Sequence, residues 1–341
     1  MDDDIKSALV EPAQIIKRGG LVVFPTETVY GLGADATNPD ATSRIYAAKG
    51  RPSDNPLIIH IASPNDAERY AFTNSVYYLL AEAFMPGPLT VILPAKDTVP
   101  LTTRGGLSTV AVRCPENKIA RYLIEASGVA IAAPSANLSG SPSPTMFKHV
   151  YSDMFGRVDA IIDGGNCDFG LESTIVKVDS FDTVTLLRPG KITKEEIESL
   201  DLNVNVANAV VDSLKENETA ISPGMKYKHY APKSPLILLD GSKENVVEYI
   251  ERVRKDTDQI AVIAYVDDIE YMSSHLIGVD FYSFGSKCNE TEQAHILFGL
   301  LRDTDRKEYN TIYAPLPQKS GIGLALYNRM IRAAAHNIIR L

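Results

Sequence analysis

Residues 49–60 are the stretch that most constrains the fold, because they join a helix to a strand through a short polar loop. A helix is expected over residues 38–49, with an asparagine-proline start and a glycine directly after its end. Arg51 precedes a proline and is therefore pushed out of helical geometry. Residues 57–61 are apolar except for His60 and predict a short buried strand with alternating faces. The stretch therefore predicts a helix, a polar loop and a strand in succession.

The polar side chains of this stretch admit two interpretations. Lys49 alone is explained as a cation at a helix C-terminus. That explanation does not cover Arg51 and Asn55, which are held between prolines, or His60, which lies in an apolar strand. Burying such groups without partners is costly. A cluster of donors on a stiff loop suits an anion such as a nucleotide phosphate. Spacing alone leaves both interpretations open.

Composition excludes several classes of protein. With 341 residues, 45% of them hydrophobic and 23% charged, the chain is long enough for two globular domains. A net charge of -9 argues against a protein that coats nucleic acid, although it leaves room for a local basic patch. Cys114, Cys167 and Cys288 lack metal-ligand spacing and favour a reducing compartment. With no apolar run of membrane-spanning length and an acidic start at residues 2–4, the sequence predicts a cytoplasmic protein.

The first half of the chain alternates strands and helices, which is typical of a mixed α/β domain. A helical segment is expected over residues 66–84, and Thr193 opens another helix with a capping box. Residues 25–30 are expected to be extended, with Thr26, Thr28 and Tyr30 on one face. Further strands are expected at residues 21–24, 89–93, 109–113, 129–133, 172–178 and 183–188.

The usual phosphate-binding signatures do not fit this sequence. Residues 31–36 match G-x-G-x-x-A by letters, but six residues separate them from the preceding strand. Gly190-Lys191 lacks both the earlier glycine and the following hydroxyl residue of a Walker A loop. We therefore expect neither a dinucleotide-binding loop nor a P-loop.

Polar residues instead gather where apolar strands end. A period of two places Thr109 and Arg113 on one face of their strand. Residues 134–144 are rich in serine and proline, and their small side chains let backbone amides approach a ligand closely. A solvated edge strand and an ordinary connecting loop are the alternatives. Taken together, the polar strand ends predict a cleft at the edge of a sheet.

Six motifs, in this order between residues 24 and 190, closely resemble the YrdC-like domain of L-threonylcarbamoyladenylate synthase. They are Phe24-Pro25-Thr26-Glu27-Thr28-Val29-Tyr30-Gly31-Leu32, Lys49-Gly50-Arg51-Pro52 with Asn55-Pro56-Leu57, Ser108-Thr109-Val110-Ala111-Val112-Arg113, Pro134-Ser135-Ala136-Asn137, Glu172-Ser173-Thr174-Ile175 and Arg188-Pro189-Gly190. The resemblance implies an α/β fold with an open, twisted mixed sheet and helices around a positively charged cavity.

The same resemblance implies the site residues. Those at threonine-contacting positions are Thr28, His60, Arg113 and Ser173. Those at ATP-contacting positions are Lys49, Arg51, Asn55, Thr109, Ala133, Ser135, Asn137, Ser143, Arg188 and Tyr230. Lys49 and Arg51 are the expected catalytic residues, acting by charge and position without a covalent intermediate.

The implied reaction joins L-threonine, bicarbonate and ATP into threonylcarbamoyl-AMP and pyrophosphate. Its product feeds threonylcarbamoyl-adenosine formation next to the anticodon of tRNA, so the downstream transfer machinery is the expected partner. Direct tRNA contact is possible. Magnesium is expected to enter with the ATP phosphates, because the sequence shows no cluster of carboxylates for a dedicated protein site.

The second half predicts a linker and a smaller domain. We expect the catalytic domain to span residues 1–203, a linker and active-site lid residues 204–234, and a parallel, Rossmann-like α/β domain residues 235–341. Residues 203–220 are expected to be helical, and Lys226, His229 and Tyr230 of the lid are expected to reach the active site. In the last domain, strands are expected at 236–239, 260–266, 281–284 and 311–314, and helices at 243–254, 290–303 and 323–339.

Two other functions remain as alternatives. Carbamoyl transfer of the hydrogenase-maturation type uses a similar domain, but that family adds zinc-binding regions and this chain has no CxxC pair. A non-catalytic RNA-binding module would use the cavity as a basic platform, although the acidic total charge argues against it.

Overall fold

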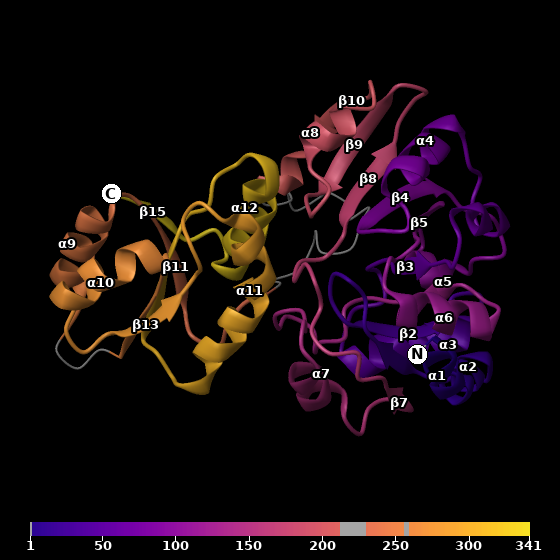
Figure 1. Ribbon diagram of the computed structural model, residues 1–341, viewed down its shortest axis with the longest axis horizontal. Coiled ribbons are helices and arrows are strands. Elements are labelled where there is room, and N and C mark those ends of the chain that lie inside the picture. Colours follow the sequence, from indigo (N-terminus) through magenta and orange to yellow (C-terminus); the bar gives the residue numbers. More distant parts are fainter. Residues whose placement is uncertain (1, 212–229, 256–258) are drawn as a thin grey trace. The chain divides into compact units, whose positions relative to one another are not determined.

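The computed structural model describes residues 2–211, 230–255 and 259–341 (Figure 1). The chain divides into two compact units, each described by itself below. Unit 1 comprises Met1–Ser139 and Ser143–Tyr227, and unit 2 comprises Gly140–Pro142 and Lys228–Leu341. Across the described ranges, no helix has the length and apolar character needed to cross a membrane.

Unit 1 is built on a 10-stranded mixed sheet in the order β10-β9-β8-β4-β5-β3-β6-β2-β1-β7. Its centre is the β4-β5-β3 group, in which β5 runs parallel to β3 and antiparallel to β4. The strands are β1 (Val22–Phe24), β2 (Gly31–Asp35), β3 (Ile58–His60), β4 (Leu89–Pro94), β5 (Thr109–Arg113), β6 (Ile131–Ala132), β7 (Ala160–Ile161), β8 (Thr174–Val178), β9 (Thr183–Arg188) and β10 (Asn203–Val206).

The helices of unit 1 connect these strands. α3 shows how local sequence fixes the ends of a helix, because Asn38 Oδ1 accepts bonds from the first-turn amides and Gly50 ends the helix in left-handed conformation at φ 61°. The expected capping box at Thr193 is also present. The helices are α1 (Asp2–Ala8), α2 (Val10–Lys17), α3 (Pro39–Lys49), α4 (Ser75–Phe84), α5 (Leu101–Arg104), α6 (Lys118–Ser127), α7 (Phe147–Met154) and α8 (Lys194–Glu198), with 3-10 turns at Pro64–Arg69 and Asn208–Val210.

Three expectations for unit 1 were wrong. Residues 66–84 are not one helix, because a 3-10 turn ends at Arg69 and Asn74 caps a separate helix, α4. Residues 203–210 form β10 and a 3-10 turn, since β10 pairs in parallel with β9 and tertiary pairing overrides local helix preference. Residues 25–30 are not extended: the Thr26 hydroxyl bonds the backbone of Thr28 and Val29 and folds the chain into a bend. Residues 212–220 lie outside the described residues.

Residues 31–36 belong to the sheet and do not form a dinucleotide-binding loop. Gly31 to Asp35 form strand β2, which pairs with β1 and β6, and not a phosphate-binding turn. Gly33 is needed for packing, because a Cβ atom there would lie 2.7 Å from Phe24 and from Ile131. The glycines of this segment are therefore part of the sheet and its packing.

Unit 2 is a five-stranded parallel sheet in the order β13-β12-β14-β11-β15, as expected for a Rossmann-like domain. In Figure 1, α9 and α10 cover one face of this sheet while α11 and α12 cover the other. The strands are β11 (Leu236–Asp240), β12 (Ile260–Ala264), β13 (Asp280–Ser283), β14 (Thr311–Pro315) and β15 (Ile338–Arg340). The helices are α9 (Lys243–Val253), α10 (Val266–His275), α11 (Glu290–Asp303) and α12 (Gly321–Ala333), with a 3-10 turn at Thr304–Arg306.

Two features of unit 2 were not anticipated. Helix α10 follows β12 directly and buries only Met272, so it carries a weak apolar signal. The last expected helix ends early at Ala333, because residues 335 and 336 have positive φ angles and the chain turns into β15 beside β11. The final strand was therefore wrongly predicted as helix.

Candidate active site

The register of the central strands puts several predicted site residues on one face of the sheet. Directly opposite residues on paired strands point to the same side. His60 lies opposite Arg113, and Ile58 lies opposite Ala111. Since side chains alternate along β5, Thr109 and Arg113 share one face of that strand, as the sequence predicted, and lie about 13 Å apart along it. The register places His60 on the same face of the sheet. β5 is an interior strand, which excludes the edge-strand alternative.

This face has an apolar floor. The buried side chains that form it come from five neighbouring strands: Ile58, Ile92, Ala111, Ile175 and Leu187. Polar residues flank the floor, with Arg113 at the carboxyl end of β5 and Thr109 at its start. An apolar floor with polar groups at its ends is the usual composition of a small-molecule site.

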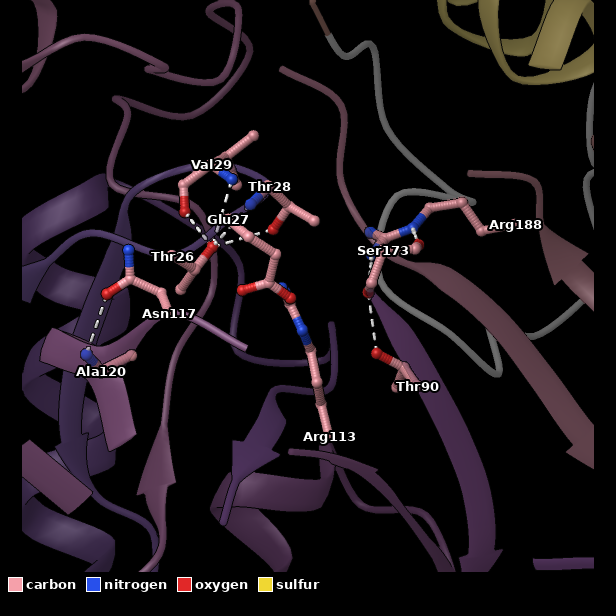
Figure 2. A network of polar contacts seen from close by, with 10 residues as sticks. All are labelled: Thr26, Glu27, Thr28, Val29, Thr90, Arg113, Asn117, Ala120, Ser173 and Arg188. Atoms are coloured by element: carbon pink, nitrogen blue, oxygen red, sulfur yellow. Dashed lines mark hydrogen bonds and ion pairs between the residues drawn. The ribbon is translucent and has the colours of Figure 1, made fainter. Parts of the chain in front are cut away.

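At one end of the face, Arg113 forms a buried ion pair with Glu27. Arg113 Nη2 donates to Glu27 Oε1 at 2.6 Å, and the side chains are 4% and 2% exposed (Figure 2). Glu27 lies in the bend after β1, where the hydroxyls of Thr26 and Thr28 lie 2.9 Å apart. Thr28 therefore lies near Arg113, because its neighbour in sequence, Glu27, pairs with that arginine.

His60 is neutral at this end of the face. Burial, and to a smaller degree the nearby Arg113 cation, lower the pKa of His60 from 6.5 to about 3. Its Nδ1 lies 3.3 Å from the carbonyl oxygen of Ile131, and its ring meets Phe24 edge-on. His60 can therefore orient a ligand through hydrogen bonds without adding a charge.

Ser173 and Arg188 are joined beside the same face. Arg188 Nε donates to the Ser173 carbonyl oxygen at 3.0 Å, and its Nη2 donates to the Ser173 hydroxyl at 3.1 Å (Figure 2). Thr90 Oγ1 lies 2.8 Å from the same hydroxyl. Next to Ser173 in sequence, Glu172 accepts a bond of 2.6 Å from the Ser143 hydroxyl. A predicted threonine-binding residue is thus bonded directly to a predicted ATP-binding one.

Lys49, Ser135 and Asn137 form a second cluster. Lys49 Nζ donates to the carbonyl oxygens of Ser135 and Asn137 at 2.5 Å each, and Ser135 Oγ bonds Asn137 Oδ1. The Ala133 amide donates to the Ile58 carbonyl, which places this loop against the start of β3. The end of α3 and the loop after β6 are therefore tied together by one buried cation.

Arg51 and Asn55 lie in the loop between α3 and β3, as predicted. Arg51 Nη2 donates to the Pro56 carbonyl at 3.3 Å. Asn55 is 1% exposed, and its Oδ1 has no hydrogen-bond partner among the residues that the structure describes. An unpaired buried acceptor is unusual in a folded protein, and a bound ligand or water could supply its partner.

Tyr230 belongs to unit 2 and is described there. Its ring stacks on Phe298 at a centroid distance of 5.1 Å and lies under Arg329, and the residue is 5% exposed. Lys226 and His229, the other expected lid residues, lie outside the described residues. The lid stays a prediction.

Sequence reasoning missed Glu27, Thr90 and Glu172 as members of the site. Glu27 and Glu172 stood inside the quoted motifs but carried no predicted role, and Thr90 lay in an apolar strand. The sequence did contain a signal for the two acids, because Glu27 directly precedes Thr28 and Glu172 directly precedes Ser173, and both of those are predicted ligand residues. Among the described residues, no group of three or more histidine, cysteine, aspartate or glutamate side chains could hold a metal ion.

Comparisons with known proteins agree with this architecture. Residues 14–190 match a family model described as telomere recombination, the Sua5/YciO/YrdC family. Residues 192–335 match the model of the threonylcarbamoyl-AMP synthase C-terminal domain.

Full-length relatives carry the same name. The threonylcarbamoyl-AMP synthase of Pyrococcus abyssi is 42% identical over 96% of this chain and 94% of its own length. The Bacillus subtilis enzyme is 41% identical over 97% and 94%. The crystal structure of P. abyssi Sua5 complexed with L-threonine superposes with a TM-score of 0.90 at 40% identity, covering 98% of this chain and 96% of that one. The chain therefore belongs to the threonylcarbamoyl-AMP synthase family and is an enzyme of its two-domain form.

Proposed function

We propose that this enzyme converts L-threonine, bicarbonate and ATP into L-threonylcarbamoyl-AMP and pyrophosphate. One observation carries the proposal: Thr109, expected to bind ATP, and Arg113 and His60, expected to bind threonine, share one face of the central sheet. The spacing of about 13 Å along β5 suits an amino acid placed next to a nucleotide. The P. abyssi relative crystallised with L-threonine supports the amino acid.

The threonine end would hold the substrate by charge and by hydrogen bonds. Arg113 would bind the α-carboxylate, since a guanidinium presents donors in a fork that matches a carboxylate. Thr28, neutral His60 and Ser173 would orient the remainder of the amino acid. The apolar floor would exclude water, which protects a carbamate from hydrolysis.

The nucleotide end would work by position and charge. The threonine amine and bicarbonate would form a carbamate with loss of water. An oxygen of that carbamate would attack the α-phosphorus, the bond from the α-phosphorus to the oxygen that bridges to the β-phosphorus would break, and pyrophosphate would leave. Arg51 and Arg188 would oppose the growing negative charge. Lys49 would hold Ser135 and Asn137 in place for the nucleotide while adding its own positive charge. Asn55, Ala133 and Ser143 would complete the set, and no covalent enzyme intermediate is required.

Magnesium would enter as the ATP complex. The described residues bring no three acidic, histidine or cysteine side chains together, so the phosphates would supply most of its ligands. We place the reaction in the cytoplasm, because Cys114, Cys167 and Cys288 are all outside disulfides. The product would serve the machinery that modifies tRNA next to the anticodon.

A direct assay tests the proposal. The protein is incubated with magnesium, ATP, labelled bicarbonate and single amino acids, and pyrophosphate and labelled adenylate are measured. Threonine should give both products, and serine or valine much less. Labelled carbamoyl-adenylate formed from ATP and labelled carbamoyl phosphate, supplied in place of bicarbonate and the amino acid, would instead support the hydrogenase-maturation chemistry. Retention of RNA with no pyrophosphate under any condition would support the binding module and overturn the synthase.

A further inference from the structure

Glu27 is a charged residue at the threonine end of the face that the proposed mechanism does not use. In the view of Figure 2, its carboxylate points at the Arg113 guanidinium, Thr28 lies above the pair, and Ser173 lies to its right. The backbone around Glu27 is fixed, because its carbonyl accepts from the Phe169 amide at 2.9 Å. Glu27 is therefore a rigid part of the candidate site.

The ion pair is only half satisfied. An arginine and a carboxylate can form two parallel hydrogen bonds, but here a single bond of 2.6 Å joins Glu27 Oε1 and Arg113 Nη2. Glu27 Oε2 and Arg113 Nε are both buried, and neither has a hydrogen-bond partner in the described parts of the chain. Buried polar atoms without partners cost free energy, so this arrangement calls for a ligand.

The two unsatisfied atoms differ in kind. Glu27 Oε2 is a negatively charged acceptor, and Arg113 Nε is a donor on a cation. A free amino acid presents the complementary groups, an α-ammonium and an α-carboxylate. Because the Glu27–Arg113 pair is neutral overall, a zwitterion binds without leaving net charge in a buried site, whereas a simple anion would not.

The expected threonine-binding residues also lack an anion. Thr28 and Ser173 are hydroxyls, His60 is a buried imidazole, and Arg113 is the cation. None of these four supplies the negative charge that would pair with an ammonium group. Glu27 supplies it, because its carboxylate already touches Arg113.

We propose that Glu27 is the specificity-determining residue that binds the α-ammonium group of the amino acid while Arg113 binds its α-carboxylate. This inference rests on the proposed function, because it assumes that threonine occupies this end of the face. The pair then requires both charges on the same small ligand, and a hydroxy acid without an amine is rejected.

Calorimetric binding without ATP tests the inference. Wild-type protein is titrated with L-threonine and with 3-hydroxybutyrate, which is threonine without its amine. Wild type should bind threonine at least tenfold more tightly. Glu27→Gln should weaken threonine binding by about 10- to 100-fold, the range expected when a charge-assisted hydrogen bond is lost, and should change 3-hydroxybutyrate binding by less than about threefold. Glu125→Gln on the exposed surface of α6 is the matched control and should change neither.

The outcomes separate the two proposals. If wild type binds threonine and 3-hydroxybutyrate equally, the role of Glu27 is overturned and the synthase proposal stands. If Glu27→Gln loses both ligands equally while remaining folded by near-UV circular dichroism, Glu27 is structural and the inference fails. If Glu27→Gln does not fold, the wild-type comparison still decides. If wild type binds no threonine, the proposed function itself is overturned.

Discussion

Lys49 Nζ lies 2.5 Å from the main-chain oxygen of Ser135, although 86 residues separate them in the chain. The same ammonium group donates to the Asn137 carbonyl, and Lys49 is 3% exposed. A buried cation that donates to carbonyl oxygens holds a loop as well as presenting charge. Lys49 is therefore structural, and we expect its charge to act on the nucleotide as well.

Lys49→Met should lower stability and abolish synthesis. The two carbonyl oxygens would lose a charged donor, which costs about 2–4 kcal/mol and lowers the Tm of unit 1 by roughly 5–15 °C. Thermal unfolding followed by circular dichroism measures the shift. Lys148→Met, at an exposed position of α7, is the control and should stay within about 0.5 kcal/mol of wild type. A Lys49→Met protein that unfolds at the wild-type temperature would contradict the assignment.

Ser173→Ala and Arg188→Lys should show coupled effects. Arg188 donates two hydrogen bonds to Ser173, one to its carbonyl oxygen and one to its hydroxyl. Either substitution therefore disturbs the contact between the two residues. Each variant should raise the apparent KM for threonine about tenfold, equivalent to the loss of roughly 1.4 kcal/mol. The double variant should be less impaired than the sum predicts, because the partners act as a unit. Strictly additive effects would show that the two residues act independently.

Stability should fall as the pH drops below 6.5. The pKa of His60 is lowered from 6.5 to about 3 in the fold, so the unfolded chain binds the proton more readily. The neutral imidazole therefore contributes its full stabilisation above pH 6.5 and loses it as the pH falls toward 3. Between pH 7 and pH 5 the loss from His60 is about 2 kcal/mol.

Urea unfolding at the two pH values measures this loss, with His60→Gln as the comparison. The variant cannot titrate at this position, so its stability should change less between pH 7 and pH 5. An equal pH dependence in both proteins would show that His60 is not the group responsible.

Tyr230→Phe should separate packing from ligand binding. The Tyr230 ring stacks on Phe298, and phenylalanine keeps that contact while removing the hydroxyl. The Tm should therefore stay close to wild type, whereas Tyr230→Ala should destabilise unit 2 by about 3 kcal/mol or more. If the hydroxyl contacts ATP, Tyr230→Phe raises the KM for ATP at unchanged Tm. Unchanged kinetics in this variant would remove Tyr230 from the ATP set.

The sequence predicted helix ends and strand faces correctly where neighbouring residues alone decide them. Asn38 and Gly50 bound α3 as expected, and the alternation along residues 109–113 placed Thr109 and Arg113 on one face. The parallel strands of unit 2 followed from the alternation of strands and helices. The expectations failed where a distant partner decided, as in residues 203–206, which became a strand only because β9 lies beside them.

The sequence by itself determined the family, the two α/β folds and the candidate ligand residues, because motifs, caps and hydrophobic period are local properties of the chain. Only the tertiary structure decided which of those residues meet. Glu27 and Arg113 are 86 positions apart and become a buried pair because the bend after β1 and the end of β5 converge. Burial then made His60 neutral and left acceptor and donor atoms of that pair unsatisfied, and no local pattern encodes either property.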